Sequence, residues 1–546
     1  MPVISFSYND FTEILGKDLG KEKLIERIPM IGCEVARVEG DQIDVEFFPN
    51  RPDLYCVEGI ARAMKAFFGL KPGMPKYEVN DSNIDMEIDP SVVEVRPFLV
   101  CGIVRDMKLT DDTVKSLMDM QEKLHLTVGR KRKKVSVGVH DLDKVRPPFT
   151  YKAVKPESVS FVPLASTEKM TLKEILERHE KGKEYASILD GHPQYPVILD
   201  KEGSVLSFPP IINGTLTQVT NETKNLFLDV TGTDYGTISV TLNIISTALA
   251  ERGCRLESVV MRYPKRAPFR TPSLLSKKKA LDPKYACKLI GKELSVKEII
   301  ECLHRMMYEA KQVDDRIEVG IPAFRADVLH EVDLVEDVAI GHSYHKLTGT
   351  LPKAMTFGRE LAGEFRFERA RQVMIGLGYH EMMSFALTNR KKQFENMGEK
   401  SGKAVELQNP VTEDQTIVRV SLLPSLLELL KINKHHEHPH KIFEAGEVAV
   451  DTGNERHLSA VFIHARANFT EAKSLSEAVM REMGLEGLYL EKPCTKPFLI
   501  KGRSATVVLE KGGRELGIFG ELHPKVITAF ELSHPVGMFE FNLENW

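Results

Sequence analysis

Carboxylates crowd one short stretch of the sequence, FRADVLHEVDLVEDVAIGH at residues 324–342. Its acids are Asp327, Glu331, Asp333, Glu336 and Asp337. If residues 330–341 form a helix, three of them stand at positions i, i+3 and i+4, so that Asp333, Glu336 and Asp337 share one face. Asp327, in a loop just upstream, can reach the same face, whereas Glu331 stands apart from the pattern. Several hard oxygens on one face are ligands that suit Mg²⁺.

The crowding has a cost, because like charges at this spacing oppose an isolated helix by about 0.2–0.5 kcal/mol per pair. A bound cation would offset that repulsion. The alternative is a solvated acidic face, or one that docks a basic partner, since helix N-termini attract carboxylates in any case. The same helix would bury Val332, Val335 and Ala339.

A run of basic side chains at residues 130–134 is the second feature with chemical potential. It comprises Arg130, Lys131, Arg132, Lys133 and Lys134. The run leads into a predicted strand in which Val135, Val137 and Val139 alternate with small or polar residues. It is either the solvated end of a hairpin or a set of phosphate contacts whose affinity falls steeply with salt.

Several fragments imitate known motifs without their context. KMTLK at 169–173 is better explained as a helix cap, with Thr171 and Glu174 as a capping box. FRFE at 365–368 lies at the start of a predicted amphipathic helix, and HHEHPH at 435–440 is predicted to be a polar loop. Phosphate-binding motifs of the types G-x-x-x-x-G-K-[ST] and G-x-G-x-x-G do not occur.

Composition limits the class of protein. The 546 residues are 42% hydrophobic and 28% charged, with a formal net charge of −4, which excludes a uniformly basic nucleic-acid binder. The seven cysteines form no C-x-x-C pair, which favours a reducing compartment. The sequence shows neither a basic, apolar leader nor an apolar stretch of about eighteen residues. We therefore expect a cytoplasmic protein with no membrane partner.

The pattern of helices, strands and turns predicts an α/β (α+β) chain of several domains. Residues 71–91, rich in proline, are predicted to be a connector, and residues 262–276 a basic linker. A capping box of Ser295 and Glu298 begins a helix in the third block. The predicted domains are an N-terminal α/β domain at 1–90, a mixed domain at 91–268, a small helical domain at 269–346 and a final domain at 347–546.

Seven motifs, in order along the chain, resemble the beta subunits of phenylalanyl-tRNA synthetases of the archaeal and eukaryotic type. They are FFPNRPDLYCVEGIARAMKAFFG, RKRKKVSVGVHDLD, VLSFPPIING, LDVTGTD, FRADVLHEVDLVEDVAIGHSY, ELQNPVTEDQTIVRVSLLPSLL and KIFEAGEV. The resemblance covers nearly the whole chain. It implies an editing domain at 91–268, a winged-helix-like domain at 269–346, and at 347–546 a catalytic-like domain with the antiparallel sheet of class II synthetases.

The resemblance also implies partners and cofactors. Family members work as heterotetramers of two alpha and two beta subunits, in which the alpha subunit activates phenylalanine with ATP and charges tRNA(Phe). We therefore expect no ATP or aminoacylation site in this chain, and ATP is a substrate of the complex. The family assigns Mg²⁺ to carboxylates that correspond to Asp327, Asp333, Glu336 and Asp337.

The editing domain of the family hydrolyses tyrosine wrongly attached to phenylalanine tRNA. A hydrophobic pocket built for phenylalanine rejects an added hydroxyl only about a hundredfold. A second site with polar groups can select the hydroxyl, because unpaired buried polar groups are costly. The resemblance implies pocket residues at Ser207, Pro209, Asn213, Asp229, Thr231 and Asp234, with His192 nearby; each of these motifs is also compatible with simple turn chemistry.

Two other classes of protein remain open from the sequence. One is a free-standing enzyme, either an aminoacyl-tRNA deacylase or a metal-dependent nuclease that uses the acidic segment. The other is a nucleic-acid-binding scaffold without enzymatic activity, built on the third domain.

Overall fold

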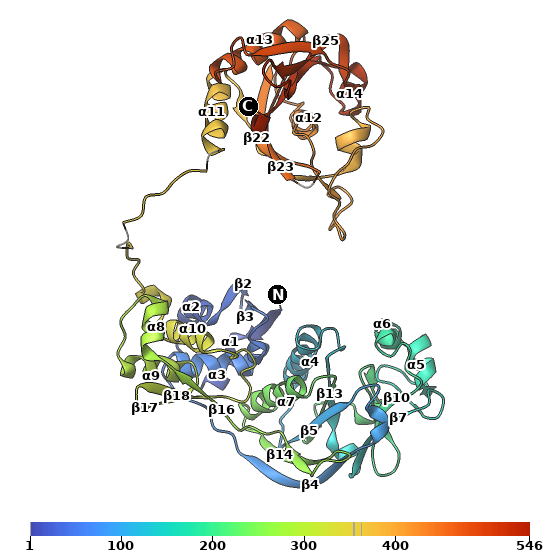
Figure 1. Ribbon diagram of the computed structural model, residues 1–546. Coiled ribbons are helices and arrows are strands. Elements are labelled where there is room, and N and C mark those ends of the chain that lie inside the picture. Colours follow the sequence, from blue (N-terminus) through green and yellow to red (C-terminus); the bar gives the residue numbers. More distant parts are fainter. Residues whose placement is uncertain (1, 353–354, 362, 452, 546) are drawn as a thin grey trace. The chain divides into compact units, whose positions relative to one another are not determined.

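The computed structural model describes residues 2–352, 355–361, 363–451 and 453–545 (Figure 1). The chain divides into two compact units between Leu351 and Pro352. Both are mixtures of helices and sheets, as the sequence predicts. None of the helices in the described part of the chain has the length and apolar character that crossing a bilayer requires.

The first unit begins with a small antiparallel sheet of order β1-β3-β2. Its strands are β1 (Val3–Ser7), β2 (Cys33–Glu39) and β3 (Gln42–Phe47). The helices of this block are α1 (Tyr8–Leu15), α2 (Lys21–Arg27) and α3 (Val57–Phe67). The hydroxyl of Ser7 accepts a hydrogen bond from the amide of Asp10, so Ser7 caps α1.

A ten-stranded sheet forms the middle of the first unit, in the order β12-β11-β10-β7-β4-β14-β5-β13-β6, with β15 paired to β14. Its strands are β4 (Val79–Ile88), β5 (Phe98–Arg105), β6 (Val135–Asp141), β7 (Phe149–Val154), β10 (Tyr195–Leu199), β11 (Val205–Phe208), β12 (Ile212–Asn213), β13 (Leu226–Gly232), β14 (Arg255–Arg262) and β15 (Phe269–Thr271). Its helices are α4 (Asp111–Leu126), α5 (Leu172–Arg178), α6 (Glu180–Tyr185) and α7 (Tyr235–Ala250). The capping box of Thr171 and Glu174 at the start of α5 is confirmed.

The predicted connector at 71–91 is wrong over residues 79–88, which form β4. This strand pairs in parallel with both β14 and β7, so it belongs to the sheet of the second block. Ser82, Ile84, Met86 and Ile88 are buried at alternate positions, a period of two that the flanking prolines obscured. The predicted linker at 262–276 is likewise wrong over Phe269–Thr271, which pair with β14 as β15.

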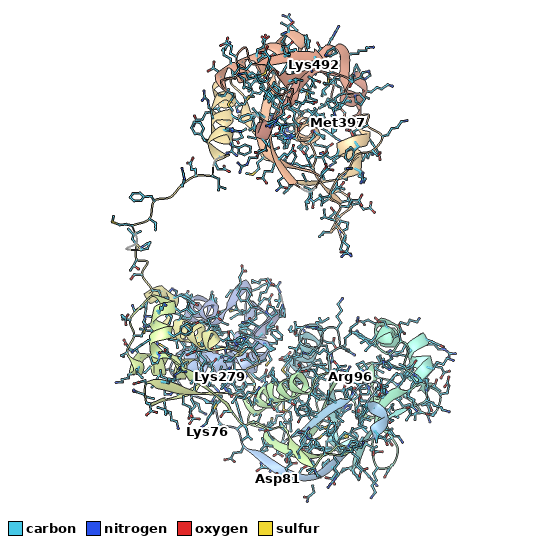
Figure 2. The ribbon with its side chains drawn as sticks, in the orientation of Figure 1. Lys76, Asp81, Arg96, Lys279, Met397 and Lys492 are labelled. Atoms are coloured by element: carbon cyan, nitrogen blue, oxygen red, sulfur yellow. The ribbon has the colours of Figure 1, made fainter. Side chains whose placement is uncertain are left out.

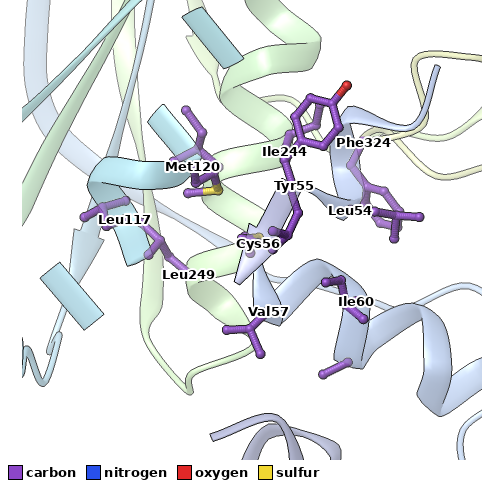
Figure 3. Close-up of a cluster of buried hydrophobic side chains, with 14 of the residues drawn as sticks. Leu54, Tyr55, Cys56, Val57, Ile60, Leu117, Met120, Ile244, Leu249 and Phe324 are labelled. Carbon is purple, nitrogen blue, oxygen red and sulfur yellow. The ribbon is translucent and has the colours of Figure 1, made fainter. Parts of the chain in front are cut away.

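A shared apolar core joins the N-terminal block to the large sheet (Figure 3). The segment from Leu54 to Ile60 enters it from the first block, and Phe324 enters it from a loop further along the chain. Leu117 and Met120 on α4 and Ile244 and Leu249 on α7 complete the buried cluster shown in the figure. Because these side chains are buried among one another, the two blocks form one packed body.

The third block combines a small sheet with three helices. Its antiparallel sheet has the order β16-β18-β17, from β16 (Lys277–Leu281), β17 (Glu309–Val313) and β18 (Arg316–Ile321). Its helices are α8 (Pro283–Ile290), α9 (Val296–Arg305) and α10 (Glu331–His342). The capping box of Ser295 and Glu298 is confirmed at the start of α9.

Helix α10 is the helix predicted from the acidic segment, and its buried side differs in part from the prediction. Val335 and Ala339 are buried, as expected, together with Leu334 and Val338. The prediction was wrong for Val332, which is 43% exposed. Val332 lies in the first turn, outside the stripe that packs in the core of this block.

The second unit is built on a seven-stranded sheet of order β19-β22-β23-β27-β26-β25-β24, antiparallel except where β19 meets β22. Its strands are β19 (His380–Glu381), β22 (His440–Val450), β23 (Gly453–Ile463), β24 (Tyr489–Pro493), β25 (Leu499–Leu509), β26 (Glu515–Leu522) and β27 (Val536–Asn542). Its helices include α11 (Glu364–Gly376), α12 (Leu423–Ile432), α13 (Phe469–Glu482) and α14 (Pro524–Ala529). FRFE lies in the first turns of α11, as predicted.

The two faces of this sheet pack different helices. Phe443, Leu458 and Phe539 belong to a core shared with α11 and α13, whereas Ile442 and Val461 belong to one shared with α12 and α14. Because side chains alternate along a strand, the residues at even positions of β22 share the second face. That face continues into a polar region, described below.

Candidate functional site

A cavity of about 470 Å³ lies in the large sheet block of the first unit. Three of the predicted pocket residues, Ser207, Pro209 and Asn213, line it. They come from β11, the turn after it, and β12, and Ser207 pairs with Asn213 across the two strands. Helix α4 and strand β6 contribute the other side of the cavity, including Gln121 and Ser136. The cavity thus has several polar groups in a largely apolar wall, which is typical of a binding site for a small molecule or group.

Asp229 lies behind this wall and reaches the cavity through other residues. It is 1% exposed, on β13, and its Oδ2 lies 2.7 Å from Nε2 of His140 on β6. The other ring nitrogen, Nδ1, lies 2.7 Å from the hydroxyl of Thr217, and Thr217 lines the cavity. A buried chain of hydrogen bonds therefore runs from the Asp229 carboxylate to the cavity.

Gly138 makes room for this chain. It pairs directly with Asp229 across β6 and β13, so both residues point to the same face of the sheet. A β-carbon at position 138 would clash with Oδ2 of Asp229 and would lie 2.8 Å from Nε2 of His140. The absence of a side chain at this position lets the carboxylate and the imidazole meet.

Thr231, two residues along β13 from Asp229, is held by a buried arginine. Arg96, labelled in Figure 2, donates from Nε to the Thr231 hydroxyl at 2.8 Å and from Nη2 to its carbonyl at 2.8 Å. Burial lowers the pKa of the Arg96 guanidinium to about 10. Thr231 is fully buried and does not line the cavity, so its contact is with the arginine.

The remaining predicted pocket residues lie elsewhere. Asp234 is exposed and caps α7, accepting a hydrogen bond of 2.7 Å from the amide of Thr237. It also lies 3.9 Å from Nζ of Lys134, a weak surface pair. His192 sits in a turn before β10 and does not border the cavity.

The basic run divides between solvent and the cavity. Arg130, Lys131 and Lys133 are exposed, whereas Arg132 is 9% exposed and lines the cavity. Three successive residues, 130–132, have positive φ, and this left-handed turn directs Arg132 inward. Arg132 donates to the carbonyl of Ile211 at 2.9 Å and lies over the ring of Tyr185, 4.4 Å from its centroid.

Glu122 and His125, on α4, complete this corner of the cavity. Glu122 accepts a hydrogen bond from Arg132 at 2.6 Å and pairs with Nδ1 of His125 at 3.2 Å. The hydrogen bond with His125 and the charges of both partners lower the pKa of Glu122 to about 2, so its carboxylate is ionised at any physiological pH. Burial lowers the pKa of His125. Apart from the basic run, no pattern in the sequence points to this cluster.

The four predicted metal ligands all border one cavity of about 580 Å³, but an arginine occupies the space among them. Arg325 binds both oxygens of Asp327, at 2.8 and 2.6 Å, and donates to Asp337 at 2.7 Å. Asp337 also accepts a hydrogen bond from the hydroxyl of Tyr308. Asp333 accepts from the amides of residues 329 and 330 and so caps α10.

This arrangement does not fit a metal ion. Nη1 of Arg325 is buried without a hydrogen-bond partner among the described residues. The group that would satisfy this nitrogen is a hydrogen-bond acceptor and not a cation. Within the described ranges, no three histidine, cysteine or acidic side chains are grouped as metal ligands. Glu336 forms no hydrogen bond or ion pair with the described residues, and burial, followed by the charges of Asp337, Asp327 and Asp333, raises its pKa. The carboxylates therefore repel one another, but they do not converge as the ligands of a metal ion would.

The second unit has a cavity of about 340 Å³ on the polar region of its sheet. Its charged lining consists of Glu399, Glu455, Glu515, Glu540, His457 and Lys496. Glu540 is buried, and its Oε1 lies 2.8 Å from Nδ1 of His457. Burial would lower the pKa of His457, but the contacts with Glu540 and Glu455 outweigh it and raise that pKa.

Comparisons with known proteins agree with this architecture. Three family models match: the B3/4 domain over residues 107–260, the tRNA synthetase B5 domain over 279–344 and the phenylalanyl tRNA synthetase beta chain CLM domain over 347–543. Together these matches define the chain as a subunit of an aminoacyl-tRNA synthetase.

Full-length relatives identify which synthetase. The phenylalanine–tRNA ligase beta subunit of Methanosarcina barkeri is 47% identical over 547 residues, covering 100% of this chain and 99% of the relative. That of Archaeoglobus fulgidus is 44% identical, covering 100% and 98%. A crystal structure of an N-terminal fragment of the phenylalanyl-tRNA synthetase beta subunit from Pyrococcus horikoshii is 40% identical and covers 63% of this chain and 100% of the fragment, with a TM-score of 0.61. The chain belongs to the family of phenylalanine–tRNA ligase beta subunits.

Membership confirms the resemblance seen in the sequence and the multidomain α/β fold. The chain is a subunit of a ligase of protein biosynthesis. The family implies ATP and Mg²⁺ for the working complex, and an alpha subunit and tRNA as partners.

Proposed function

We propose that this chain joins an alpha subunit in a heterotetramer of two alpha and two beta subunits that attaches phenylalanine to tRNA(Phe) with ATP. In this complex the alpha subunit carries the aminoacylation site, and the second unit of this chain is a catalytic-like domain without ATP chemistry. The lining of its cavity supports the proposal, because four glutamates face a single lysine and a single histidine there. A cavity with that balance of charge repels the triphosphate of ATP.

The test is charging by separate and combined subunits. The purified chain alone should attach no phenylalanine to tRNA, and adding the alpha subunit should restore ATP-dependent charging. Charging by the chain alone would contradict the proposal.

We further propose that the cavity of about 470 Å³ is an editing site that hydrolyses Tyr-tRNA(Phe). The observation that carries this proposal is the set of polar groups around it: Ser207 and Asn213 on the wall, and Thr217 with the chain to Asp229 behind it. Such groups can pair with a phenolic hydroxyl or a water, whereas phenylalanine would leave them unpaired. The exposed cations Arg130, Lys131 and Lys133 beside the cavity are proposed to contact tRNA phosphates.

Hydrolysis of Tyr-tRNA by the assembled enzyme tests the editing site. The wild-type tetramer should release tyrosine, and Asn213→Ala should reduce this release while charging with phenylalanine is retained. Among the described residues, the side chain of Asn213 makes only a long hydrogen bond of 3.4 Å to the carbonyl of residue 139, so its removal should perturb the fold little. The same measurement on the chain alone separates a subunit-dependent editor from a free-standing deacylase.

Two further parts of the proposal concern Mg²⁺ at the acidic cavity and the compartment in which the protein acts. We propose that Mg²⁺ binds at Asp327, Asp333, Glu336 and Asp337 only in an arrangement in which Arg325 has left the position it has here. The seven cysteines are all free thiols, which agrees with the cytoplasm as the place of action.

A further inference from the structure

We propose that Asp229, His140 and Thr217 form a proton relay that takes a proton from the water attacking the ester bound in the cavity. The inference rests on the proposed editing function and assigns roles within it. Thr217 would contact the water, and the other two residues would act through Thr217.

The hydrogen-bond pattern assigns a direction to the relay. A carboxylate can only accept hydrogen bonds, so the proton of the neutral His140 ring lies on Nε2, which donates to Asp229. In the neutral ring, Nδ1 is then an acceptor and receives the hydroxyl proton of Thr217 at 2.7 Å. This is the arrangement in which a hydroxyl can pass its proton inward and accept another from the cavity.

A second acceptor allows the proton to move. The hydroxyl of Thr217 also lies 3.3 Å from the carbonyl of Gly214. Once Nδ1 of His140 carries a proton, it donates to Thr217, and the Thr217 hydroxyl can turn its own proton to Gly214. Both the neutral and the protonated ring therefore have a complete set of partners, and no buried group is left unpaired.

Burial confines the path to one exit. His140 is 0% exposed and Thr217 is 1% exposed, and the ring of His140 packs at 6.2 Å from that of Phe227. The guanidinium of Arg96 attracts the Asp229 carboxylate from the segment before β5, and Cys101 and Tyr151, whose pKa values are raised by burial, are neutral titratable groups near it on the surrounding strands. Of the three members of the relay, Thr217 alone borders the cavity. A chain of hydrogen bonds with a purely structural role would not need to end at the cavity.

The chemical step balances without another reactant. The water oxygen forms a bond to the ester carbonyl carbon, its proton passes to Oγ1 of Thr217, and the Thr217 proton passes to Nδ1 of His140. The negative Asp229 stabilises the resulting imidazolium. The tetrahedral intermediate then breaks its bond to the ribose oxygen, and the proton returns along the same path to that oxygen, which releases tyrosine and free tRNA.

The experiment measures single-turnover hydrolysis of Tyr-tRNA(Phe) by the assembled enzyme with its alpha subunit. Thr217→Val keeps the volume and removes the hydroxyl, and we expect the maximal rate to fall roughly 100-fold or more, with half-saturation unchanged. Thr217→Ser should restore most of the rate. Asp229→Asn, which removes the charge that stabilises the imidazolium, should lower the rate similarly.

Thr223→Val is the matched control. Thr223 is similarly buried, at 2%, and its hydroxyl is likewise hydrogen-bonded, donating to Asp141 at 2.8 Å, but it does not border the cavity. Its hydrolysis rate should equal that of the wild type, and all variants should charge phenylalanine normally.

The outcomes separate the relay from the editing function. If the wild type hydrolyses Tyr-tRNA(Phe) and both Thr217→Val and Asp229→Asn hydrolyse it at the wild-type rate, the relay is overturned and the editing site stays in place. No hydrolysis by the wild type overturns both. If Thr217→Val fails to fold, as shown by lost charging, the active Thr217→Ser beside an inactive Asp229→Asn supports the relay, and an Asp229→Asn variant as fast as the wild type overturns it.

Discussion

Both units of the molecule hold a histidine against a buried carboxylate on a sheet, at nearly the same distance, but the second ring nitrogen meets a different partner in each. His140 lies 2.7 Å from Asp229, and its other nitrogen meets the hydroxyl of Thr217. His457 lies 2.8 Å from Glu540, and its other nitrogen lies 3.4 Å from a carboxylate oxygen of Glu455. A ring between two carboxylates donates from both nitrogens and is held protonated, whereas a ring between a carboxylate and a hydroxyl can gain and lose a proton.

The carboxylates differ as well. Glu540 accepts hydrogen bonds from the hydroxyl of Ser421 at 2.7 Å and from the amides of Leu422 and Leu423 at 3.2 and 3.1 Å, where α12 begins. It therefore fixes a helix N-terminus to the sheet. A histidine–carboxylate pair acts as a structural brace when each of its polar atoms has a fixed partner. It can act as a proton relay when one end reaches a cavity through a group that can both donate and accept.

Removing the pair of His457 and Glu540 should have the largest effect on stability. Glu540→Ala leaves His457 and the first amides of α12 without their acceptor, and breaking a buried pair in this way costs about 3–5 kcal/mol of unfolding free energy. Denaturant unfolding of the chain measures the loss. Glu544→Ala, at an exposed position, should change the free energy of unfolding by no more than about 0.5 kcal/mol. A similar stability for both variants would contradict the role of Glu540.

The relay should be broken by adding a single methyl group. Gly138→Ala forces the new β-carbon against the Asp229 carboxylate, and overpacking of this kind costs about 1–3 kcal/mol. Tyr-tRNA hydrolysis should be lost with it, while charging with phenylalanine persists. The control is Gly236→Ala on α7, where a β-carbon would lie 3.7 Å from Asp234, an ordinary contact. Retained hydrolysis in Gly138→Ala would show that the Asp229–His140 contact is dispensable.

The brace should also show a characteristic pH dependence. The folded pKa of His457 is raised above its ordinary value of 6.5, so its contribution is complete below pH 6.5 and is lost as pH rises through the raised value. The hydrogen bonds that Glu540 receives lower the pKa of that buried carboxyl below 4.5, although burial opposes this, so its contribution is complete above pH 4.5 and is lost as pH falls further. The pair is therefore most stabilising between these values.

The measurement compares the wild type with His457→Gln at several pH values. A charge-assisted hydrogen bond contributes about 1.5–3 kcal/mol and a neutral one about 0.5–1.5, so we expect the stability difference to shrink by about 1 kcal/mol from pH 6 to pH 9. His435→Gln, in the exposed loop before β22, should show a constant difference. A constant difference for His457→Gln would mean that the ring is not protonated in the folded state.

Sequence reasoning found what is encoded locally and missed what depends on distant pairing. The capping boxes at Thr171 and Ser295 span three residues each, and the helix of the acidic segment has its own periodicity, so all three were predictable. The partners of His140 lie 89 and 77 residues away, and Arg96 lies 135 residues from Thr231. No local pattern specifies such contacts, because the register of the large sheet creates them.

The basic run shows the same limit on a smaller scale. Five adjacent cations look equivalent in the sequence, yet the left-handed turn at residues 130–132 separates Arg132 from its exposed neighbours. Likewise, the resemblance placed six residues in one pocket, and the structure brings only Ser207, Pro209 and Asn213 to the cavity wall. The segments named by the resemblance thus lie at or behind the wall of this cavity, and the backbone decides which side chain of each segment reaches the wall.

Glu336, in the acidic cavity, is a carboxylate with no histidine opposite it. Its substitution should have the smallest effect on stability. Burial and three neighbouring carboxylates raise the pKa of Glu336, so its ionised form opposes folding above its unfolded pKa. Glu336→Gln should therefore raise the free energy of unfolding at neutral pH, by about 0.5 kcal/mol or less because the side chain is exposed and solvent screens the repulsion. The gain should disappear in acid, where the wild-type carboxyl is also neutral, and Glu301→Gln on the exposed side of α9 should show no such gain. Adding Mg²⁺ extends the test. If Arg325 can leave and a cation can take its place, Mg²⁺ should stabilise the wild type more than it stabilises Glu336→Gln. Equal stabilisation of both would mean that Arg325 alone neutralises the carboxylates of this cavity.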